Sequence, residues 1–199
     1  MWNLLFPQAK YAQQQGLALN LNSIGPACVT SPDQCPRYRF HARRSRQVFA
    51  LWAAVFGPSR RSRLRFVLST WTESTAASRE ILSFEDAFKY ADHLGVVGYL
   101  SSVTTINSAW AAKSVPDVFK ELYGALPAAV RTTAAQAAIA AQYNVSLIAY
   151  EGGPALVENG VIEGGGATGA VTSLLIAAAR DPAMQVPMWV ATSKLQHYV

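Results

Sequence analysis

The sequence has few charged residues and no long hydrophobic run. Charged residues make up 15% of its 199 residues and hydrophobic residues 51%, a balance typical of globular domains. No apolar run reaches the roughly 18–20 residues that a membrane-spanning helix requires, so we expect no membrane partner. The opening residues also lack the basic leader and apolar stretch of a signal peptide. The length predicts a single domain over residues 1–199.

Cysteine and histidine are scarce. Cys28 and Cys35 are the only cysteines, and the chain has three histidines. Their spacing supplies no zinc motif, because such a motif needs four ligands at short intervals, and we expect no metal site. The two cysteines lie in a loop-like stretch, where they fit either a small disulfide ring in an exported protein or two free thiols.

Acidic residues are absent from residues 34–72, and arginines are concentrated there. This stretch fits a polyanion-binding patch, which makes nucleic-acid binding one alternative function. It also fits the solvated face of a helix followed by a basic loop, because apolar residues in the segment 40–56 recur at helical spacing. We favour the helix and expect no nucleic-acid partner, because no recognition motif accompanies the arginines. The arginines are Arg37, Arg39, Arg43, Arg44, Arg46, Arg60, Arg61, Arg63 and Arg65, and the recurring apolar residues are Val48, Leu51, Trp52, Val55 and Phe56.

Beyond the arginines, short apolar runs alternate with helical patterns. Cap-type residues precede two of the helical segments, at Ser83 and Ser114, each followed by acids within the first turn. Runs that are apolar on both faces and alternate with helices are typical of a parallel α/β sheet. We therefore expect strands at residues 65–71, 94–100 and 145–150. We expect helices at residues 83–91, 114–123, 128–142, 171–180 and 184–198, with a break at Gly124 and Pro127.

Aromatic and acidic side chains stand at the predicted carboxyl ends of these strands. In a parallel α/β fold functional residues gather at that edge, and here it offers Trp71, Glu73, Tyr99, Tyr150 and Glu151. Aromatic faces stack on sugars, and a carboxylate stabilises or attacks an oxocarbenium-like centre. Tyr99 is a hydrogen-bond donor that would keep Glu151 ionised. The two glycines after Glu151 leave room for a molecule to approach.

A glycine-rich segment offers a competing motif. Gly164-Gly165-Gly166-Ala167-Thr168-Gly169 formally matches the dinucleotide-binding pattern G-x-G-x-x-G. It begins more than ten residues after the strand ends, whereas a dinucleotide site needs a tight strand-to-helix turn. We therefore interpret it as a loop beside the site and expect no cofactor.

Two segments resemble one enzyme family. Tyr150-Glu151-Gly152-Gly153 after an apolar strand is similar to the nucleophile segment of clan A retaining glycoside hydrolases, and in particular of bacterial cellulase-like proteins. The opening Trp2-Asn3 and Phe6 resemble the residues that follow that group's acid/base motif, Ser-Asn-Glu-Val-Trp-Asn. The resemblance implies a secreted parent protein that hydrolyses β-linked poly- or oligosaccharides by a two-carboxylate mechanism.

The same resemblance implies a partial (β/α)8 TIM barrel. The three predicted strands would be strands five, six and seven, with the N-terminal half and the last strand missing. Glu151 would be the nucleophile, Tyr99 its partner, and Trp71, Tyr150, Trp2 and Asn3 the substrate contacts. The acid/base would lie just upstream of Met1, as in a truncated reading frame, with Glu73 the only nearby substitute.

Two alternatives to an active hydrolase follow from the missing acid. The chain is then either a glycoside-hydrolase-like protein that lacks half of its catalytic pair, or an inactive barrel fragment with weak carbohydrate binding. In both cases a carbohydrate is the expected partner. Self-association through open sheet edges is also expected, because an incomplete barrel leaves strand edges unpaired.

Overall fold

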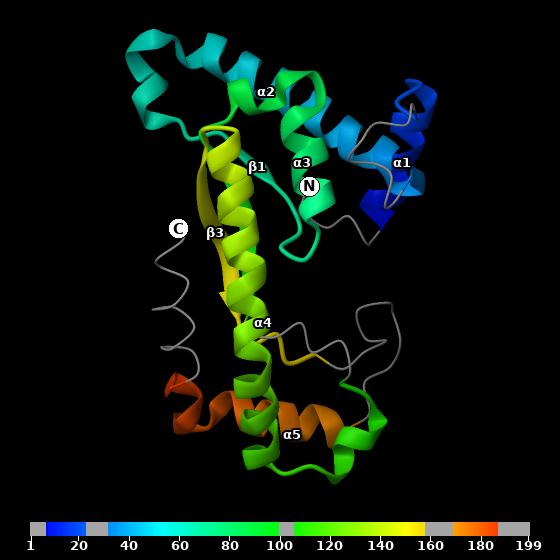
Figure 1. Ribbon diagram of the computed structural model, residues 1–199, viewed down its shortest axis with the longest axis vertical. Coiled ribbons are helices and arrows are strands. Elements are labelled where there is room, and N and C mark those ends of the chain that lie inside the picture. Colours follow the sequence, from blue (N-terminus) through cyan, green and yellow to red (C-terminus); the bar gives the residue numbers. More distant parts are fainter. Residues whose placement is uncertain (1–6, 23–31, 100–105, 158–168, 187–199) are drawn as a thin grey trace. The chain divides into compact units, whose positions relative to one another are not determined.

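The computed structural model describes residues 7–22, 32–99, 106–157 and 169–186. The chain divides into two compact units, residues 1–96 with 135–149 and residues 97–134 with 150–199. Helices account for most of the described chain, and a small open sheet runs through it (Figure 1). None of the described helices has the length and apolar character needed to cross a membrane.

The sheet has three parallel strands in the order β1-β2-β3. The strands are β1 (Val67–Ser69), β2 (His93–Tyr99) and β3 (Ser146–Gly153). β1 and β2 pair with Val67 opposite His93. The prediction of a parallel α/β arrangement is confirmed at this level, although β1 is shorter than predicted. β3 is longer than predicted, so Glu151 lies within the strand rather than at its end.

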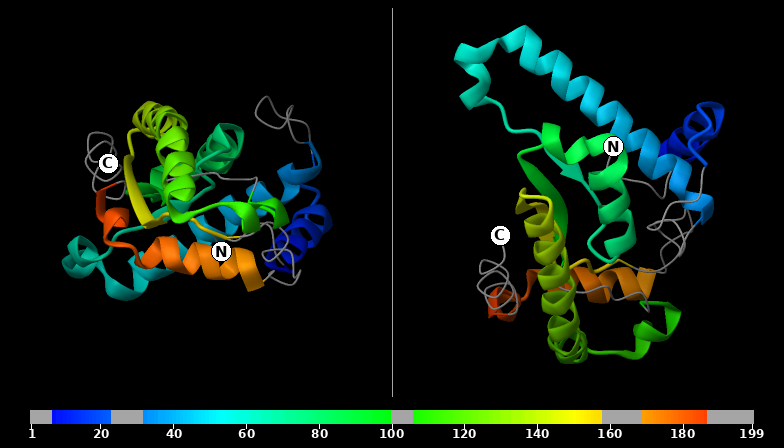
Figure 2. Two further views of the ribbon diagram at one scale, coloured as in Figure 1. Left: turned by 90° about the horizontal axis from the view of Figure 1, so that it is seen from below. Right: turned by 45° about the horizontal axis from the view of Figure 1, so that its top comes forward.

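The first unit is built on one long helix. α2 (Cys35–Phe56) is preceded by α1 (Pro7–Ala18) and by a 3-10 turn, η2 (Pro32–Gln34), and is followed by η3 (Pro58–Arg63). α1 packs on the N-terminal half of α2, where an added Cβ on Gly16 would meet the Pro36 carbonyl oxygen at 2.2 Å (Figure 2). The core of this unit centres on Leu68, Ile81, Leu82, Leu94 and Ile139.

The helix predicted for residues 83–91 is present only as an irregular 3-10 helix and not as an α-helix. The helix in this region is α3 (Thr75–Ser83), and its N-terminal cap is Ser74, whose side chain accepts a hydrogen bond from the Ala77 N–H. The segment after it, η4 (Phe84–Tyr90), is an irregular 3-10 turn. Burial explains the difference, because residues 77, 78 and 80–82 give α3 a face that enters the core.

Hydrogen bonds from α2 stabilise the unusual backbone conformation of η4. Glu85 and Asp86 have left-handed backbone angles, with φ of 50° and 56°, which non-glycine residues adopt only with local support. Arg43 donates to the Glu85 carboxylate from Nε at 3.0 Å, and Arg46 donates to the Glu85 carbonyl oxygen at 3.0 Å. Two arginines of α2 therefore stabilise a conformation that the local sequence disfavours.

The second unit has its own smaller core. Its elements are η5 (Ser108–Ala112), the first part of α4 (Val115–Gln142), α5 (Gly169–Arg180) and η6 (Pro182–Met184). Ile106, Trp110, Leu122, Val171 and Leu175 are buried together in it. The helix predicted for residues 171–180 is confirmed, whereas most of the one predicted for residues 184–198 lies outside the described residues.

The predicted break at Gly124 and Pro127 is absent, because α4 runs unbroken through both residues. Proline in a helix interior removes one backbone hydrogen bond, yet the helix continues. The predicted start is correct, since the Ser114 N–H and hydroxyl both donate to the Asp117 carboxylate. Buried side chains along α4, including Val118 and Leu122, outweigh the local cost of the proline.

The apolar face predicted for α2 does not face the core: most of its side chains are exposed. Leu51, Trp52 and Val55 are 62%, 49% and 73% exposed. By contrast, Arg39 is buried against Glu80, with Nε and the carboxylate 2.5 Å apart. Apolar spacing located the helix correctly but did not identify its buried face. An acid that is distant in sequence, Glu80, pairs with Arg39 and so allows part of the arginine-bearing face to be buried.

Candidate active site

Tyr99 and Glu151 form a hydrogen-bonded pair in the second unit. Tyr99 is the last residue of β2, and Glu151 lies near the carboxyl end of the neighbouring strand β3. The Tyr99 hydroxyl donates to Glu151 Oε1. The Glu151 side chain is otherwise exposed. The arrangement therefore presents an oriented carboxylate to solvent at the edge where parallel α/β folds carry their functional residues.

The phenol of this pair is held in its protonated form. Burial, the hydrogen bond to Glu151 and the negative charge of Glu151 raise the pKa of Tyr99 to about 12. Burial and the same charge also raise the pKa of Tyr150. Both phenols are therefore neutral at pH 7, and Tyr99 remains a donor to the carboxylate.

Close packing of two strands requires a glycine at position 152, apart from any access to the site. A Cβ built on Gly152 would meet the Gly98 carbonyl oxygen at 2.9 Å, so glycine lets β3 approach β2 closely. The space predicted beside Glu151 is thus occupied at Gly152 by the neighbouring strand. At Gly153 an added Cβ meets nothing within 4 Å.

The other predicted site residues are not all described. Trp71 and Glu73 belong to the first unit, where Trp71 is half-buried and Glu73 is exposed. Tyr150 is 37% exposed in the second unit, next to Glu151. Trp2 and Asn3, the remaining substrate contacts, lie outside the described residues.

Gln136 fixes the backbone that carries Trp71. Its fully buried side-chain nitrogen donates to the Trp71 carbonyl oxygen at 3.2 Å and to the Thr72 carbonyl oxygen at 2.7 Å. The amide oxygen of Gln136 is buried without a hydrogen-bond partner among the described residues. This anchor reaches from α4 to the carboxyl end of β1 and was not apparent from the sequence.

His41 was likewise missed by sequence reasoning. It lies on α2, and its Nε2 donates to the Ser69 carbonyl oxygen at 3.1 Å, which fixes the tautomer because a carbonyl only accepts. Burial lowers the pKa of His41 to about 4, so the ring is neutral at pH 7. No local signal pairs His41 with Ser69, since 28 residues separate them.

The described ranges contain no group of three histidine, cysteine, aspartate or glutamate side chains that could hold a metal ion. Cys35 is in a disulfide, which settles for this residue the alternative that the sequence left open. The other cysteine of the chain, Cys28, lies outside the described residues. The segment 164–169 with its glycine-rich motif is described only from Gly169.

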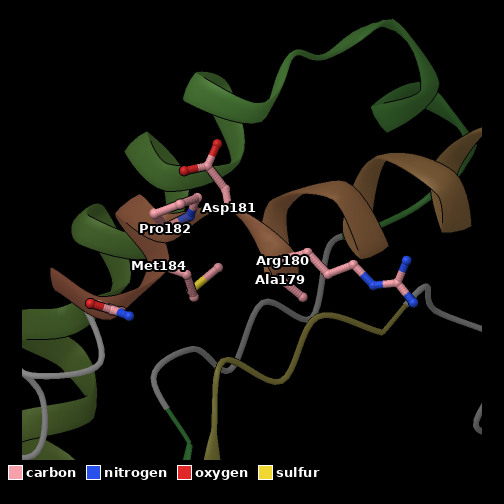
Figure 3. A pocket seen from close by; sticks show the side chains of 6 residues that line it. Ala179, Arg180, Asp181, Pro182 and Met184 are labelled. Atoms are coloured by element: carbon pink, nitrogen blue, oxygen red, sulfur yellow. The ribbon is translucent and has the colours of Figure 1, made fainter.

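A separate hollow lies at the end of α5, as Figure 3 shows. It has a volume of about 360 Å³ and contains none of the predicted site residues. Its walls carry one guanidinium and one carboxylate but no aromatic ring. The lining residues are Ala179, Arg180, Asp181, Pro182, Met184 and Gln185.

The hydrogen-bonded pair of Tyr99 and Glu151 is therefore the strongest candidate site. The catalytic and binding roles predicted from the sequence stay predictions. No protein-family model, curated protein or solved structure matches the chain.

Proposed function

We propose that the chain is a glycoside-hydrolase-like protein that acts on a β-linked poly- or oligosaccharide, with Glu151 as the nucleophile. The observation that carries this proposal is the hydrogen bond from Tyr99 to Glu151 across two neighbouring strands. Trp71, Tyr150 and the opening Trp2-Asn3 are the proposed sugar contacts. We also propose that the sheet is part of a (β/α)8 barrel, which is compatible with three parallel strands in chain order.

The proposed chemistry assigns one defined step to the pair. A Glu151 oxygen attacks the anomeric carbon while the bond to the leaving oxygen breaks, and a glycosyl ester forms on the carboxylate. The Tyr99 hydroxyl donates a hydrogen bond to the attacking carboxylate and orients it. Water later hydrolyses the ester and regenerates Glu151. No organic cofactor or metal enters this scheme.

Protonation of the leaving oxygen requires a second carboxyl group about 5 Å from the first in retaining enzymes. Glu73, the substitute considered from the sequence, belongs to the other compact unit. The resemblance assigns the acid to the glutamate of the Ser-Asn-Glu-Val-Trp-Asn motif, two residues before the position that Trp2 matches. Substrates with a strongly acidic leaving group need no protonation, so they test Glu151 independently of that acid.

Covalent trapping of Glu151 is the direct test. Dinitrophenyl β-glycosides of fluorosugars, with fluorine beside the anomeric carbon, form the ester but hydrolyse it slowly because fluorine destabilises the positive charge of the transition state. We expect one glycosyl adduct on the peptide that contains Glu151, detected by mass spectrometry across gluco-, manno- and xylo-configured reagents.

Two variants serve as controls for the trapping experiment. Glu151→Gln should abolish the adduct, and Tyr99→Phe should slow its formation without moving it. Absence of an adduct with every reagent, or an adduct that persists in Glu151→Gln, would contradict the assignment of the nucleophile.

An inactive carbohydrate-binding protein is the second candidate. It is favoured by a single described carboxylate at the pair and by the exposed ring of Tyr150. Affinity electrophoresis in gels that contain soluble β-glucan, xylan or mannan distinguishes the candidates. Retardation that Tyr150→Ala removes, without any covalent adduct, identifies binding without catalysis.

A further inference from the structure

The end of α2 exposes an apolar surface that the first unit leaves uncovered. We call the exposed side chains of Leu51, Trp52 and Val55, with those of Arg63 and Arg65 just beyond them, the α2 tip. Leu51 and Val55 are one helical turn apart and 62% and 73% exposed, and Trp52 between them is 49% exposed. Single exposed apolar residues are ordinary, but adjacent ones mark interaction surfaces.

Aromatic stacking keeps these side chains on the outer side. Phe49 stacks on Phe66 with ring centroids 4.8 Å apart, and Phe49 packs against the core of the unit. Trp52 stacks on Phe56 at 5.4 Å. Figure 2 shows α2 (cyan) continuing well past α1 (blue). The inner side of the helix end is therefore occupied by Phe49, and Leu51 and Val55 face away from it.

The positive charges of the α2 tip, on Arg63 and Arg65, have no carboxylate partner among the described residues. Of the α2 arginines, Arg39 pairs with Glu80, and Arg43 and Arg46 pair with Glu85. Arg63 and Arg65 are exposed, and no carboxylate pairs with either of them within the described residues. Arg65 Nη1 donates only to nearby backbone, to the Ser62 and Leu64 carbonyl oxygens at 3.1 and 3.0 Å, which leaves its positive charge intact.

We propose that the α2 tip binds an anionic lipid surface. Leucine, valine and tryptophan side chains enter the boundary between headgroups and acyl chains, while adjacent arginines contact the anionic headgroups. Such a helix lies on a membrane and needs no span, so the proposal departs from the sequence-based expectation of no membrane partner without requiring a membrane-spanning helix. It also does not depend on the carbohydrate chemistry of Glu151.

A lipid surface fits better than a nucleic acid. Nucleic-acid sites combine arginines with polar or stacking contacts along a phosphate backbone. Here the two most exposed apolar side chains of the α2 tip, Val55 and Leu51, are aliphatic, and burying them in a nucleic-acid complex offers little hydrophobic gain. Apolar insertion, in contrast, uses Leu51 and Val55 directly.

Vesicle co-sedimentation tests the proposal. We expect the chain to bind vesicles of phosphatidylcholine with about one third phosphatidylglycerol, and to bind pure phosphatidylcholine at least tenfold more weakly. Binding should fall as salt is raised, because the headgroup attraction is screened. Equal affinity for both vesicles, or none for either, would overturn the proposal.

Matched variants identify the surface. Leu51→Ser with Val55→Ser should weaken vesicle binding at least tenfold, whereas Leu17→Ser with Leu19→Ser removes similarly exposed side chains elsewhere and should leave it unchanged. Arg63→Gln with Arg65→Gln should weaken binding about 30-fold, and Arg131→Gln with Arg180→Gln is its charge-matched control.

Two further measurements close the test. Circular dichroism confirms that each variant keeps the helical content of the parent, so that a folding defect is not mistaken for lost binding. A competition with duplex DNA supplies the other arm. Saturable DNA binding that the arginine variants remove, with no vesicle binding, would reject the lipid surface in favour of a polyanion site.

Discussion

The two units use their carboxylates in opposite ways. In the first unit, the Arg39 and Glu80 side chains are only 7% and 6% exposed and lie 2.5 Å apart. In the second unit, Glu151 is exposed and accepts a hydrogen bond from a neutral phenol. The buried carboxylate of Glu80 is paired with arginine and links α3 to α2. A carboxylate oriented by a neutral donor keeps its charge available, which is what a nucleophile requires.

The largest expected effect is on the buried ion pair. Glu80→Gln should lower the free energy of unfolding by about 3–5 kcal/mol, because it leaves the Arg39 charge buried without its partner. Urea unfolding followed by circular dichroism measures the loss. Lys89→Gln breaks an exposed pair with Asp86, whose side chains are 60% and 58% exposed, and should change stability by less than about 0.5 kcal/mol. Similar losses for both variants would refute the contrast.

His41 should make the first unit sensitive to acid. Its pKa is lowered from 6.5 to about 4 on folding, so the unfolded chain binds a proton in a range where the folded chain does not. The contribution of His41 to the free energy of unfolding is therefore constant above pH 6.5 and falls by about 3 kcal/mol as the pH drops from 6.5 to about 4.

The His41→Gln variant isolates this contribution. Glutamine keeps a donor for the Ser69 carbonyl oxygen but does not titrate. The difference in unfolding free energy between parent and variant, measured by urea unfolding at a series of pH values, should bend downward below pH 6.5. A difference that is independent of pH would show that His41 is not neutral and buried in solution.

Glycine substitutions compare the two units at smaller scale. Gly16→Ala places a Cβ 2.2 Å from the Pro36 carbonyl oxygen and should destabilise the packing of α1 on α2 by about 1–3 kcal/mol. Gly124→Ala meets nothing within 4 Å inside α4 and should stabilise by about 0.5–1 kcal/mol, because alanine favours helix. Thermal unfolding of both variants checks the opposite signs, and a stabilising Gly16→Ala would disprove the close approach.

The smallest effect concerns the pair itself. Glu151→Gln removes the charge that helps to raise the pKa of Tyr99 to about 12, and burial remains. The pKa of Tyr99 should therefore fall toward, but not reach, the ordinary value of 10.0. Spectrophotometric titration measures it, with the curve of Tyr99→Phe subtracted to remove the other tyrosines. An unchanged pKa would mean that the two side chains do not meet in solution.

The strands were predictable because their signal is local. Apolar runs in residues 65–71, 94–100 and 145–150 predicted the strands, and β1, β2 and β3 lie within or overlap these segments. Ser74 and Ser83 are equally good caps by residue type. Ser74 accepts a capping hydrogen bond and begins an α-helix whose buried face includes Ile81 and Leu82, whereas Ser83 accepts none and begins an irregular 3-10 helix.

The candidate site was predictable only in part. That Tyr99 and Glu151 lie near the carboxyl ends of neighbouring strands follows from strand positions and parallel order. Gln136 and His41 were not predictable, because each reaches the end of β1 from a helix that is distant in sequence. Which face of α2 is buried was also not predictable, since both faces of its second half carry apolar side chains.

By itself, the sequence determined where the strands lie and which side chains stand at their ends, because backbone preference and apolar patterning act over a few residues. Only the tertiary structure decided that Gln136 donates to the Trp71 carbonyl oxygen, 65 residues away. It also decided that Arg39 is buried and Trp52 exposed. These outcomes depend on which distant groups supply hydrogen bonds and countercharges, and that is settled when strands pair and helices pack.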